Sequence, residues 1–244
     1  MNAKFATALT WFGLPVYVWQ GLAIRRKTIR PTPPSSQQVE PIAGEGKPLR
    51  LLLVGDSSAA GVGVDDINAS LGGHLPRLLA NQSGRPVEIE IIGSNSATAG
   101  QIRDNVIPHI KKRNFSHIIV NIGTNDAKNF HTVKRFYKEF GTLLYALNAR
   151  FPRSNIIWSG IMDMQAIPVL PSPLNRILGI RSRALMACGE TLCRERLATI
   201  PDGEWDPRES NFSLDGFHAS TQGYQEWAQI LANHILKGPD SGNS

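Results

Sequence analysis

Short runs rich in leucine and β-branched residues alternate with helical stretches along most of this chain, and this alternation constrains the fold more than any other feature. The runs occupy residues 49–54, 87–92, 117–122 and 155–158, and glycine or serine follows each of them directly. Runs of this length and composition are typical of strands covered on both faces of a parallel sheet. A fifth short strand is predicted within residues 198–205.

Stretches with a helical period separate these runs, at residues 71–81, 100–112, 131–150, 180–197 and 221–236. Strands that alternate with helices predict an α/β domain with a central parallel sheet of about five strands, joined by right-handed crossovers. In open sheets of this kind, ligands bind beyond the carboxyl ends of the strands. The loops that follow the predicted strands are therefore expected to meet at one edge of the sheet.

The chain divides into four parts by composition. Residues 1–30 hold a 20-residue stretch without charge (5–24) and a basic flank, which predicts a hydrophobic helix that anchors the protein to a membrane. The basic flank favours the cytoplasmic side for the folded domain, with a cleaved signal peptide and export, or a core-packed helix, as alternatives. Residues 31–48 are proline-rich and predict an extended linker that does not join a core. Residues 49–238 form the predicted folded domain, and residues 239–244 a disordered tail.

Charge and cysteine content exclude some functions. The net charge is +6, but residues 1–50 hold seven basic and two acidic side chains, so the rest of the chain is nearly neutral. A nucleic-acid-binding domain needs a basic surface on the folded domain itself, so nucleic acid is not an expected partner. Cys188 and Cys193 are five residues apart in a predicted helix, which does not favour a disulfide. No Cys/His cluster has the spacing of zinc ligands, so no metal site is predicted.

Ser57, Asp215 and His218 are the predicted catalytic residues. Ser57 lies at a predicted strand-to-helix turn, and a serine hydroxyl becomes a strong nucleophile when a base removes its proton. Asp215 precedes His218 by three residues, a spacing that lets the carboxylate reach Nδ1 of the imidazole and leaves Nε2 free for Ser57. The tetrahedral intermediate also needs donors for its oxyanion. The candidates are the backbone N–H groups of Ser57 and Gly100 and the side-chain amide of Asn125.

Over about residues 49–236 the chain resembles the SGNH/GDSL hydrolases, a family of esterases and lipases. Four blocks carry the resemblance in the family's order: GDS at 55–57, the glycine of TAG at 98–100, GTND at 123–126 and DGFH at 215–218. The resemblance implies a flavodoxin-like three-layer α/β/α fold and hydrolysis of esters or thioesters without a metal ion or other cofactor. It implies the same roles for Ser57, His218 and Asp215, and an oxyanion hole formed by Ser57, Gly100 and Asn125.

The predicted function is that of a serine esterase or lipolytic hydrolase acting on acyl esters, either small esters or lysophospholipids near a membrane surface. Two alternatives stay open: a glycan O-deacetylase that uses the same residues, and a non-catalytic domain that binds acylated ligands. Residues 162–180 are apolar and hold three prolines, so they form either a wall of an acyl pocket or a loop packed on the core.

The remaining polar residues of interest are interpreted as structural. Asp56 and Asp126 are expected to form hydrogen bonds within turns and loops. The histidines without a matching partner in the sequence are expected to be structural or solvent-facing: His74, His109, His117, His131 and His234.

Overall fold

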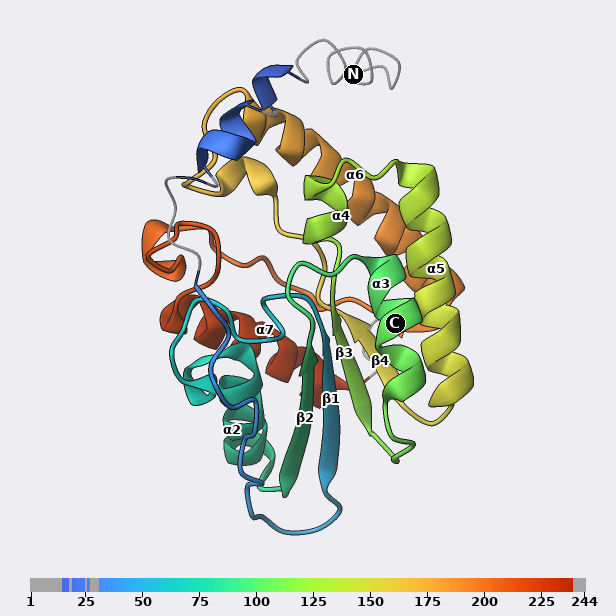
Figure 1. The fold of residues 1–244 in the computed structure, drawn as a ribbon. Helices are drawn as coiled ribbons and strands as arrows, with labels where there is room; N and C mark the ends of the chain where they lie inside the picture. The colour runs from blue at the N-terminus through green and yellow to red at the C-terminus, as the bar shows by residue number, and fades with distance from the viewer. Residues whose placement is uncertain (1–14, 18, 25, 27–30, 239–244) are drawn as a thin grey trace.

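The structure, a computed structural model, describes residues 15–17, 19–24, 26 and 31–238. Its centre is a sheet of five parallel strands in the order β2-β1-β3-β4-β5. The strands are β1 (Leu49–Gly55), β2 (Val87–Gly93), β3 (His117–Asn121), β4 (Asn155–Trp158) and β5 (Ala198–Thr199). This order is that of flavodoxin-like folds, in which the switch point lies between β1 and β3. The predicted α/β fold and parallel sheet are confirmed (Figure 1).

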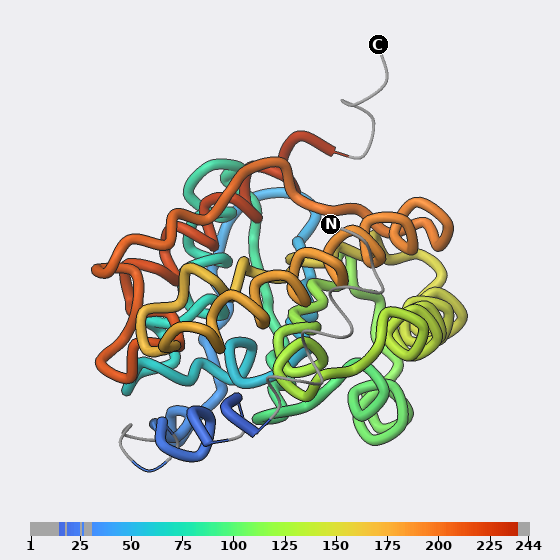
Figure 2. Tube along the Cα trace, turned by 90° about the horizontal axis from the view of Figure 1, so that it is seen from above, coloured from blue at the N-terminus to red at the C-terminus, as the bar shows by residue number. Residues whose placement is uncertain are grey.

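Helices cover both faces of the sheet and make a three-layer structure (Figures 1 and 2). One layer holds α2 (Leu71–Ser83) and α7 (Thr221–Lys237), and the other holds α3 (Ala99–Asn105), α5 (Val133–Arg150) and α6 (Leu174–Glu195). Successive side chains of β1 point to opposite faces. Leu51 and Leu53 therefore pack with α2 and α7, whereas Leu52 and Val54 pack in the cluster with α3, α5 and α6.

The register of the three central strands sets the position of the loops that follow them. Gly55, at the end of β1, pairs with Gly93 of β2 on one side and with Asn121 of β3 on the other. The three strands thus end at the same level, so the loops that begin at residues 56, 94 and 122 leave the sheet side by side. An indole also fixes the third loop, because Trp158 Nε1 donates a hydrogen bond of 2.9 Å to the carbonyl of Ile122.

Three predicted elements differ from the observed ones, and proline accounts for two of the differences. The predicted helix 100–112 ends at Asn105 and continues as a short 3₁₀ turn, Ile107–His109, because Pro108 lacks the N–H that a continuing helix needs. The predicted fifth strand is only two residues long, and Pro201 follows it closely. Helix α6 begins at Leu174 rather than at residue 180, so part of the apolar stretch 162–180 is helical.

The predicted linker is not free of the domain, which corrects the expectation for residues 31–48. Ile42 forms an antiparallel bridge with Val87 through two backbone hydrogen bonds of 3.0 Å, and Glu45 N–H donates to the carbonyl of Gly84 at 2.8 Å. The side chain of Ile42 packs against the buried cluster beneath α2 and α7. The segment joins the core because β2 is an edge strand whose first residue offers unpaired backbone groups.

The predicted hydrophobic helix 1–30 lies mostly outside the described residues. Its described part is helical at residues 15–17, 19–24 and 26. Tyr17 is buried in the core cluster, and the Gln20 amide bonds to Ser172 O at 2.8 Å and accepts from Leu174 N–H at 3.2 Å. Among the residues that the structure describes, no helix combines the length and the apolar character needed to cross a bilayer. The predicted tail 239–244 lies outside the described residues.

Candidate active site

Ser57 lies in the loop that leaves the carboxyl end of β1. The loop is anchored by a hydrogen bond of 3.0 Å from Asp56 N–H to Asn121 O, and it folds back through a bond of 3.0 Å from Val62 N–H to Ser57 O. The sequence predicts a strand-to-helix turn here, but further turns follow and α2 begins only at Leu71. Ser57 is therefore not the N-cap of a helix, and its side chain is held at a buried position, 7% exposed.

Asp215 and His218 belong to the loop before α7, as predicted. Backbone bonds close this loop: Ser213 N–H donates to His218 O at 2.8 Å, and Phe212 and Ala219 form an isolated antiparallel bridge. Asp215 Oδ1 accepts from Ser213 Oγ and from the N–H groups of Phe217 and His218, at 2.8 to 2.9 Å. The carboxylate is thus fixed by three donors before it meets the imidazole.

The structure brings Ser57, His218 and Asp215 into one hydrogen-bonded chain. Nδ1 of His218 lies 2.6 Å from Asp215 Oδ2, and Nε2 lies 3.0 Å from Ser57 Oγ. A carboxylate only accepts, so the hydrogen of the neutral ring resides on Nδ1 and Nε2 is free to accept from the hydroxyl. Burial alone would raise the pKa of Asp215, but the bonds and charge of His218 and two backbone N–H groups outweigh it and hold this pKa well below its ordinary value.

The three predicted oxyanion donors lie in the segments that follow β1, β2 and β3. Asn125 lies in the short helix α4 (Thr124–Lys128), which begins after Gly123 in a conformation with φ of 123° that suits glycine. Its Nδ2 lies 3.2 Å from Asp56 Oδ2 and 3.1 Å from Ala97 O, and so links the loop of Ser57 to the segment before α3. Gly100 is in the first turn of α3. Among the described residues, no hydrogen bond joins the N–H of Ser57 or of Gly100 to a protein acceptor.

Asp56 is a hydrogen-bonding residue of the loop, as predicted. Its Oδ1 accepts from Ser58 N–H at 3.0 Å and its Oδ2 from the Asn125 amide. The side chain is fully enclosed, and burial raises its pKa from 3.8 to about 6. Asp56 thus orients the carboxamide of Asn125, and both hydrogens of that carboxamide now face protein acceptors.

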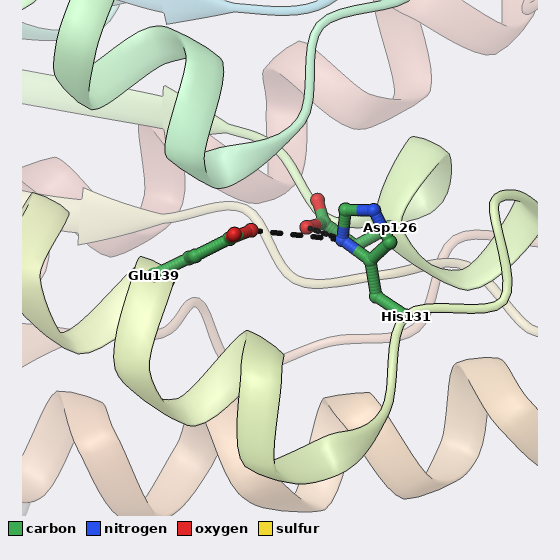
Figure 3. A group of neighbouring side chains, drawn as sticks. All are labelled: Asp126, His131 and Glu139. Atoms are coloured by element: carbon green, nitrogen blue, oxygen red, sulfur yellow. Dashed lines mark hydrogen bonds and ion pairs between the residues drawn. The ribbon is translucent and has the colours of Figure 1, made fainter.

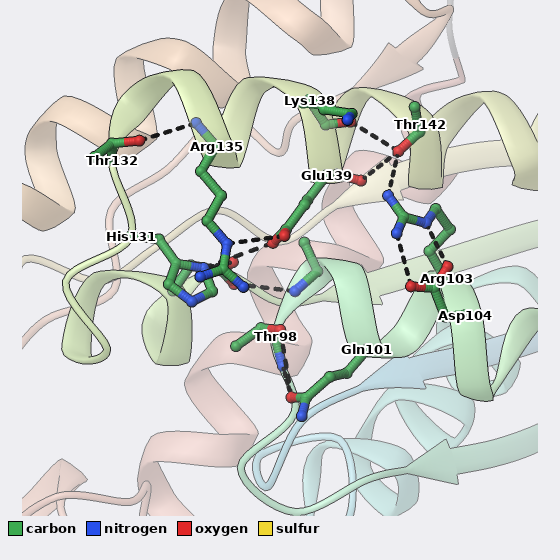
Figure 4. A network of polar contacts seen from close by, with 12 residues as sticks. Thr98, Gln101, Arg103, Asp104, His131, Thr132, Arg135, Lys138, Glu139 and Thr142 are labelled. Carbon is green, nitrogen blue, oxygen red and sulfur yellow. Dashed lines mark hydrogen bonds and ion pairs between the residues drawn. The ribbon is translucent and has the colours of Figure 1, made fainter.

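A second buried group lies behind α3, where Asp126 and His131 meet Glu139 of α5 (Figure 3). His131 Nδ1 lies 3.0 Å from Asp126 Oδ1 and 3.6 Å from Glu139 Oε2. Ligand atoms of the three residues lie within 4.8 Å of one another, so these residue types could hold a cation. The carboxylates already have other partners, however: Asp126 accepts from Ala99 N–H at 3.1 Å, and Glu139 accepts from Arg135 at 2.8 Å (Figure 4).

Sequence reasoning missed the buried group because it treated His131 as a histidine without a partner. The signal that could have revealed it is the position of His131, five residues after the aspartate of the GTND block. Burial raises the pKa of Asp126 against the opposing effects of Ala99 N–H and His131. Asp126 is a hydrogen-bonding residue, as expected, but its partner is a buried histidine as well as the backbone.

Of the other histidines, His109 is exposed, and His74, His117 and His234 are half-buried. His234 Nε2 lies 2.8 Å from the hydroxyl of Thr199, and burial lowers the pKa of His117 to about 4. Cys188 and Cys193 are free thiols.

The apolar stretch 162–180 packs mainly on the core. Its buried members include Met164, Ile167 and Leu174. Val169 contacts the loop of Asp215, because its N–H donates to Gly216 O at 3.3 Å. Two described cavities lie elsewhere: a groove of about 610 Å³ is lined by the linker, β2 and residues 109–113, and one of about 110 Å³ lies near His117 and His234.

Comparison with known proteins finds solved structures with the same fold and a family model that matches the sequence. Three solved structures share the fold with TM-scores of 0.61, 0.58 and 0.53: a family 3 carbohydrate esterase from Clostridium thermocellum, a lipase/acylhydrolase from Enterococcus faecalis and a phospholipase A1 from Streptomyces albidoflavus. They are 19%, 17% and 13% identical and cover 78%, 78% and 80% of this chain and 98%, 96% and 99% of their own chains. No curated protein matches the chain significantly. The GDSL-like lipase/acylhydrolase family model matches residues 53–226, and the chain belongs to this family.

Proposed function

We propose that this protein hydrolyses carboxylic esters, with Ser57 as the nucleophile. The observation that carries the proposal is the continuous chain from Ser57 Oγ through His218 to Asp215, with distances of 3.0 and 2.6 Å. A chain in this order lets one imidazole take the hydroxyl proton while the carboxylate stabilises the charge that forms. Membership of the GDSL-like lipase/acylhydrolase family supports the same reaction class.

In the first half of the reaction, Ser57 Oγ attacks the carbonyl carbon of the ester and its proton passes to His218 Nε2. The carbonyl oxygen becomes an oxyanion that accepts from the N–H groups of Ser57 and Gly100. The C–O bond to the alcohol then breaks, His218 returns the proton to the leaving oxygen, and an acyl-enzyme remains. Asn125 becomes a third donor when it shares with the oxyanion the hydrogen that it now gives to Asp56.

In the second half, His218 Nε2 takes a proton from a water molecule whose oxygen attacks the acyl carbon. The second oxyanion collapses, the bond to Ser57 Oγ breaks, and His218 returns the proton to the serine. The products are a free acid and a regenerated hydroxyl. The low pKa of Asp215 supports this cycle, because an ionised carboxylate stabilises the imidazolium in both halves.

The substrate is proposed to be an acyl ester, either a small ester or a lysophospholipid. Membrane association through residues 1–30 stays part of the lipid version of this proposal, and Trp19 and Leu22, which are exposed on the N-terminal helix, support it. The alternative is a glycan O-acetyl ester, which the fold shared with a family 3 carbohydrate esterase favours. Rates on esters of increasing acyl length, set beside rates on acetylated sugars, separate the two versions.

Ser57→Ala tests the proposal on a p-nitrophenyl ester. The variant is expected to lose about a thousandfold or more in kcat, because no other side chain in the hydrogen-bonded chain replaces the nucleophile. Ser159→Ala is the matched control, since this half-buried serine lies just after β4 and its hydroxyl donates to Val120 O. Unchanged turnover in Ser57→Ala would assign the reaction to another residue, and binding of acyl esters without any turnover in the unmodified protein would favour a non-catalytic domain.

A further inference from the structure

We propose that His131 is a positioning residue for the oxyanion hole, acting through Asp126 and Glu139 on the first turn of α3. This inference rests on the proposed ester hydrolysis at Ser57. His131 is 7% exposed, and its Nδ1 faces the carboxylates of Asp126 and Glu139 (Figure 3). Neither the serine, the base nor the orienting acid contacts it, so the proposed chemical steps do not require it directly.

One connection runs from His131 through Asp126 to the backbone beside Gly100. Asp126 is wholly buried, and its two oxygens have different partners. Oδ1 accepts from His131 Nδ1, and Oδ2 accepts at 3.1 Å from Ala99 N–H. Ala99 is the first residue of α3 and directly precedes Gly100, so the angle of the Asp126 carboxylate sets the direction of the neighbouring Gly100 N–H. In the sequence, Asp126 is also the residue directly after Asn125, the third predicted donor.

The second connection runs through Glu139 of α5. Its carboxylate packs against the Cα of Gly100 so closely that a Cβ at this position would lie 2.9 Å from the carboxyl carbon. The Glu139 carboxylate is held from two sides, by Arg135 at 2.8 Å and by His131 Nδ1 at 3.6 Å (Figure 4). Among the described residues the buried Oε2 atom has no hydrogen-bond partner, and His131 Nδ1 lies 3.6 Å from it. Glu139 therefore packs directly against the first turn of α3, which carries the Gly100 N–H.

His131 is the donor that lets these two buried carboxylates stay side by side. The one hydrogen on Nδ1 is donated to Asp126 Oδ1, and Nδ1 also lies 3.6 Å from Glu139 Oε2. Carboxylates only accept, so without this N–H no donor would stand beside the facing oxygens of Asp126 and Glu139. The histidine is itself held firmly, because its N–H donates to Asp126 O at 3.0 Å and its carbonyl accepts from Arg181 Nη2 at 2.6 Å. The ring thus has a fixed place from which it orients both carboxylates.

The test compares His131→Leu, which removes the donor, with His131→Asn, whose amide nitrogen stands near the position of Nδ1. His131→Leu is expected to lower kcat for a p-nitrophenyl ester roughly 100-fold, the effect of a misplacement of about 1 Å, with KM within about twofold. His131→Asn should recover most of kcat. Inhibition by an alkyl boronic acid, which forms a tetrahedral anion on the serine, should weaken in parallel with kcat. The matched control is His117→Leu, because His117 is also a histidine shielded from solvent but lies at the start of β3, whereas the loop with Asn125 and Asp126 follows the end of this strand.

Unchanged kcat in His131→Leu, equal losses in the leucine and asparagine variants, or a fall confined to KM would each overturn the inference. Glu139→Gln takes the place of the leucine variant if that variant does not fold, and unchanged kcat there overturns the inference as well. Failure of the proposed function is a different result, since unmodified protein would then show no ester hydrolysis that depends on Ser57.

Discussion

Replacing Asp56 by asparagine should change how the stability of this protein depends on pH. The carboxyl group is fully enclosed, and burial raises its pKa from 3.8 to about 6. Two donors contact it, the Ser58 N–H and the Asn125 amide, but they do not offset the cost of removing the charge from water. Asparagine keeps the size of the side chain and removes the ionisation.

The expected magnitude follows from the two pKa values. Between pH 4 and pH 6 the native protein holds a proton on Asp56 that the unfolded chain has released, so the contribution of this group to stability falls as the pH rises. The rise in the pKa of Asp56 from 3.8 to about 6 corresponds to about 3 kcal/mol of unfolding free energy, which the protonated group contributes at low pH and which is lost by pH 7. Because Asp56 is already about half ionised in the unfolded chain at pH 4, the free energy of unfolding of Asp56→Asn, relative to the unmodified protein, should rise by about 2 kcal/mol from pH 4 to pH 7.

Urea denaturation at pH 4, 5, 6 and 7 measures this difference. Other titrating groups, including Asp215, cancel when the two proteins are compared at each pH, and a constant offset from the altered contact with Asn125 does not affect the slope. The exposed Asp65→Asn variant controls for the removal of one carboxylate. A difference between the proteins that stays constant from pH 4 to pH 7 would refute the reasoning that burial governs the ionisation of Asp56.

Four further outcomes are expected. Asn125→Ala should lower kcat about 100- to 1000-fold in an ester assay if the amide serves the oxyanion, and an effect below threefold would remove it from the oxyanion hole. Gly100→Ala should lower kcat roughly tenfold, because the added methyl group would contact the Glu139 carboxylate. An unchanged kcat would show that the first turn of α3 shifts without affecting the reaction. Phe140→Ala should cost about 3–5 kcal/mol in urea unfolding, since its ring is fully buried between Phe136 and Trp158; a loss below 1 kcal/mol would contradict this packing. A chelator should leave ester hydrolysis unchanged, and a loss restored by Zn²⁺ would direct attention to the buried group around His131.

The strands, and the proximity of Ser57, Asp215 and His218, could be predicted because their signals are local. An apolar run that stops at glycine marks both a buried strand and the loop after it, and β1, which ends at Gly55, illustrates this. The pair Asp215 and His218 lies within four residues, so its geometry follows from loop conformation alone. The prediction that the helix continues beyond residue 105 was wrong, because the helical period of the apolar residues was given more weight than Pro108.

The contacts that sequence reasoning missed join residues whose own neighbours say little about them. Ile42 lies among prolines and polar residues, and only the free edge of β2 gives it a place in the core. Glu139 has the appearance of a surface residue of an amphipathic helix, because Arg135 precedes it by four residues. Its approach to Gly100 depends on how α3 packs against α5, which is a property of the folded chain.

The proposed nucleophile, Ser57, and the proposed acid–base pair, Asp215 and His218, are held by different backbone pairings. Ser57 follows β1, whose end is paired with the ends of β2 and β3. Asp215 and His218 lie in a short loop that is closed by the bridge between Phe212 and Ala219. Because one isolated bridge closes the loop of residues 212–219 whereas continuous pairing holds the strands, we expect mild denaturant to uncouple the imidazole from the hydroxyl before the sheet melts. Loss of the proposed ester hydrolysis would then precede loss of structure.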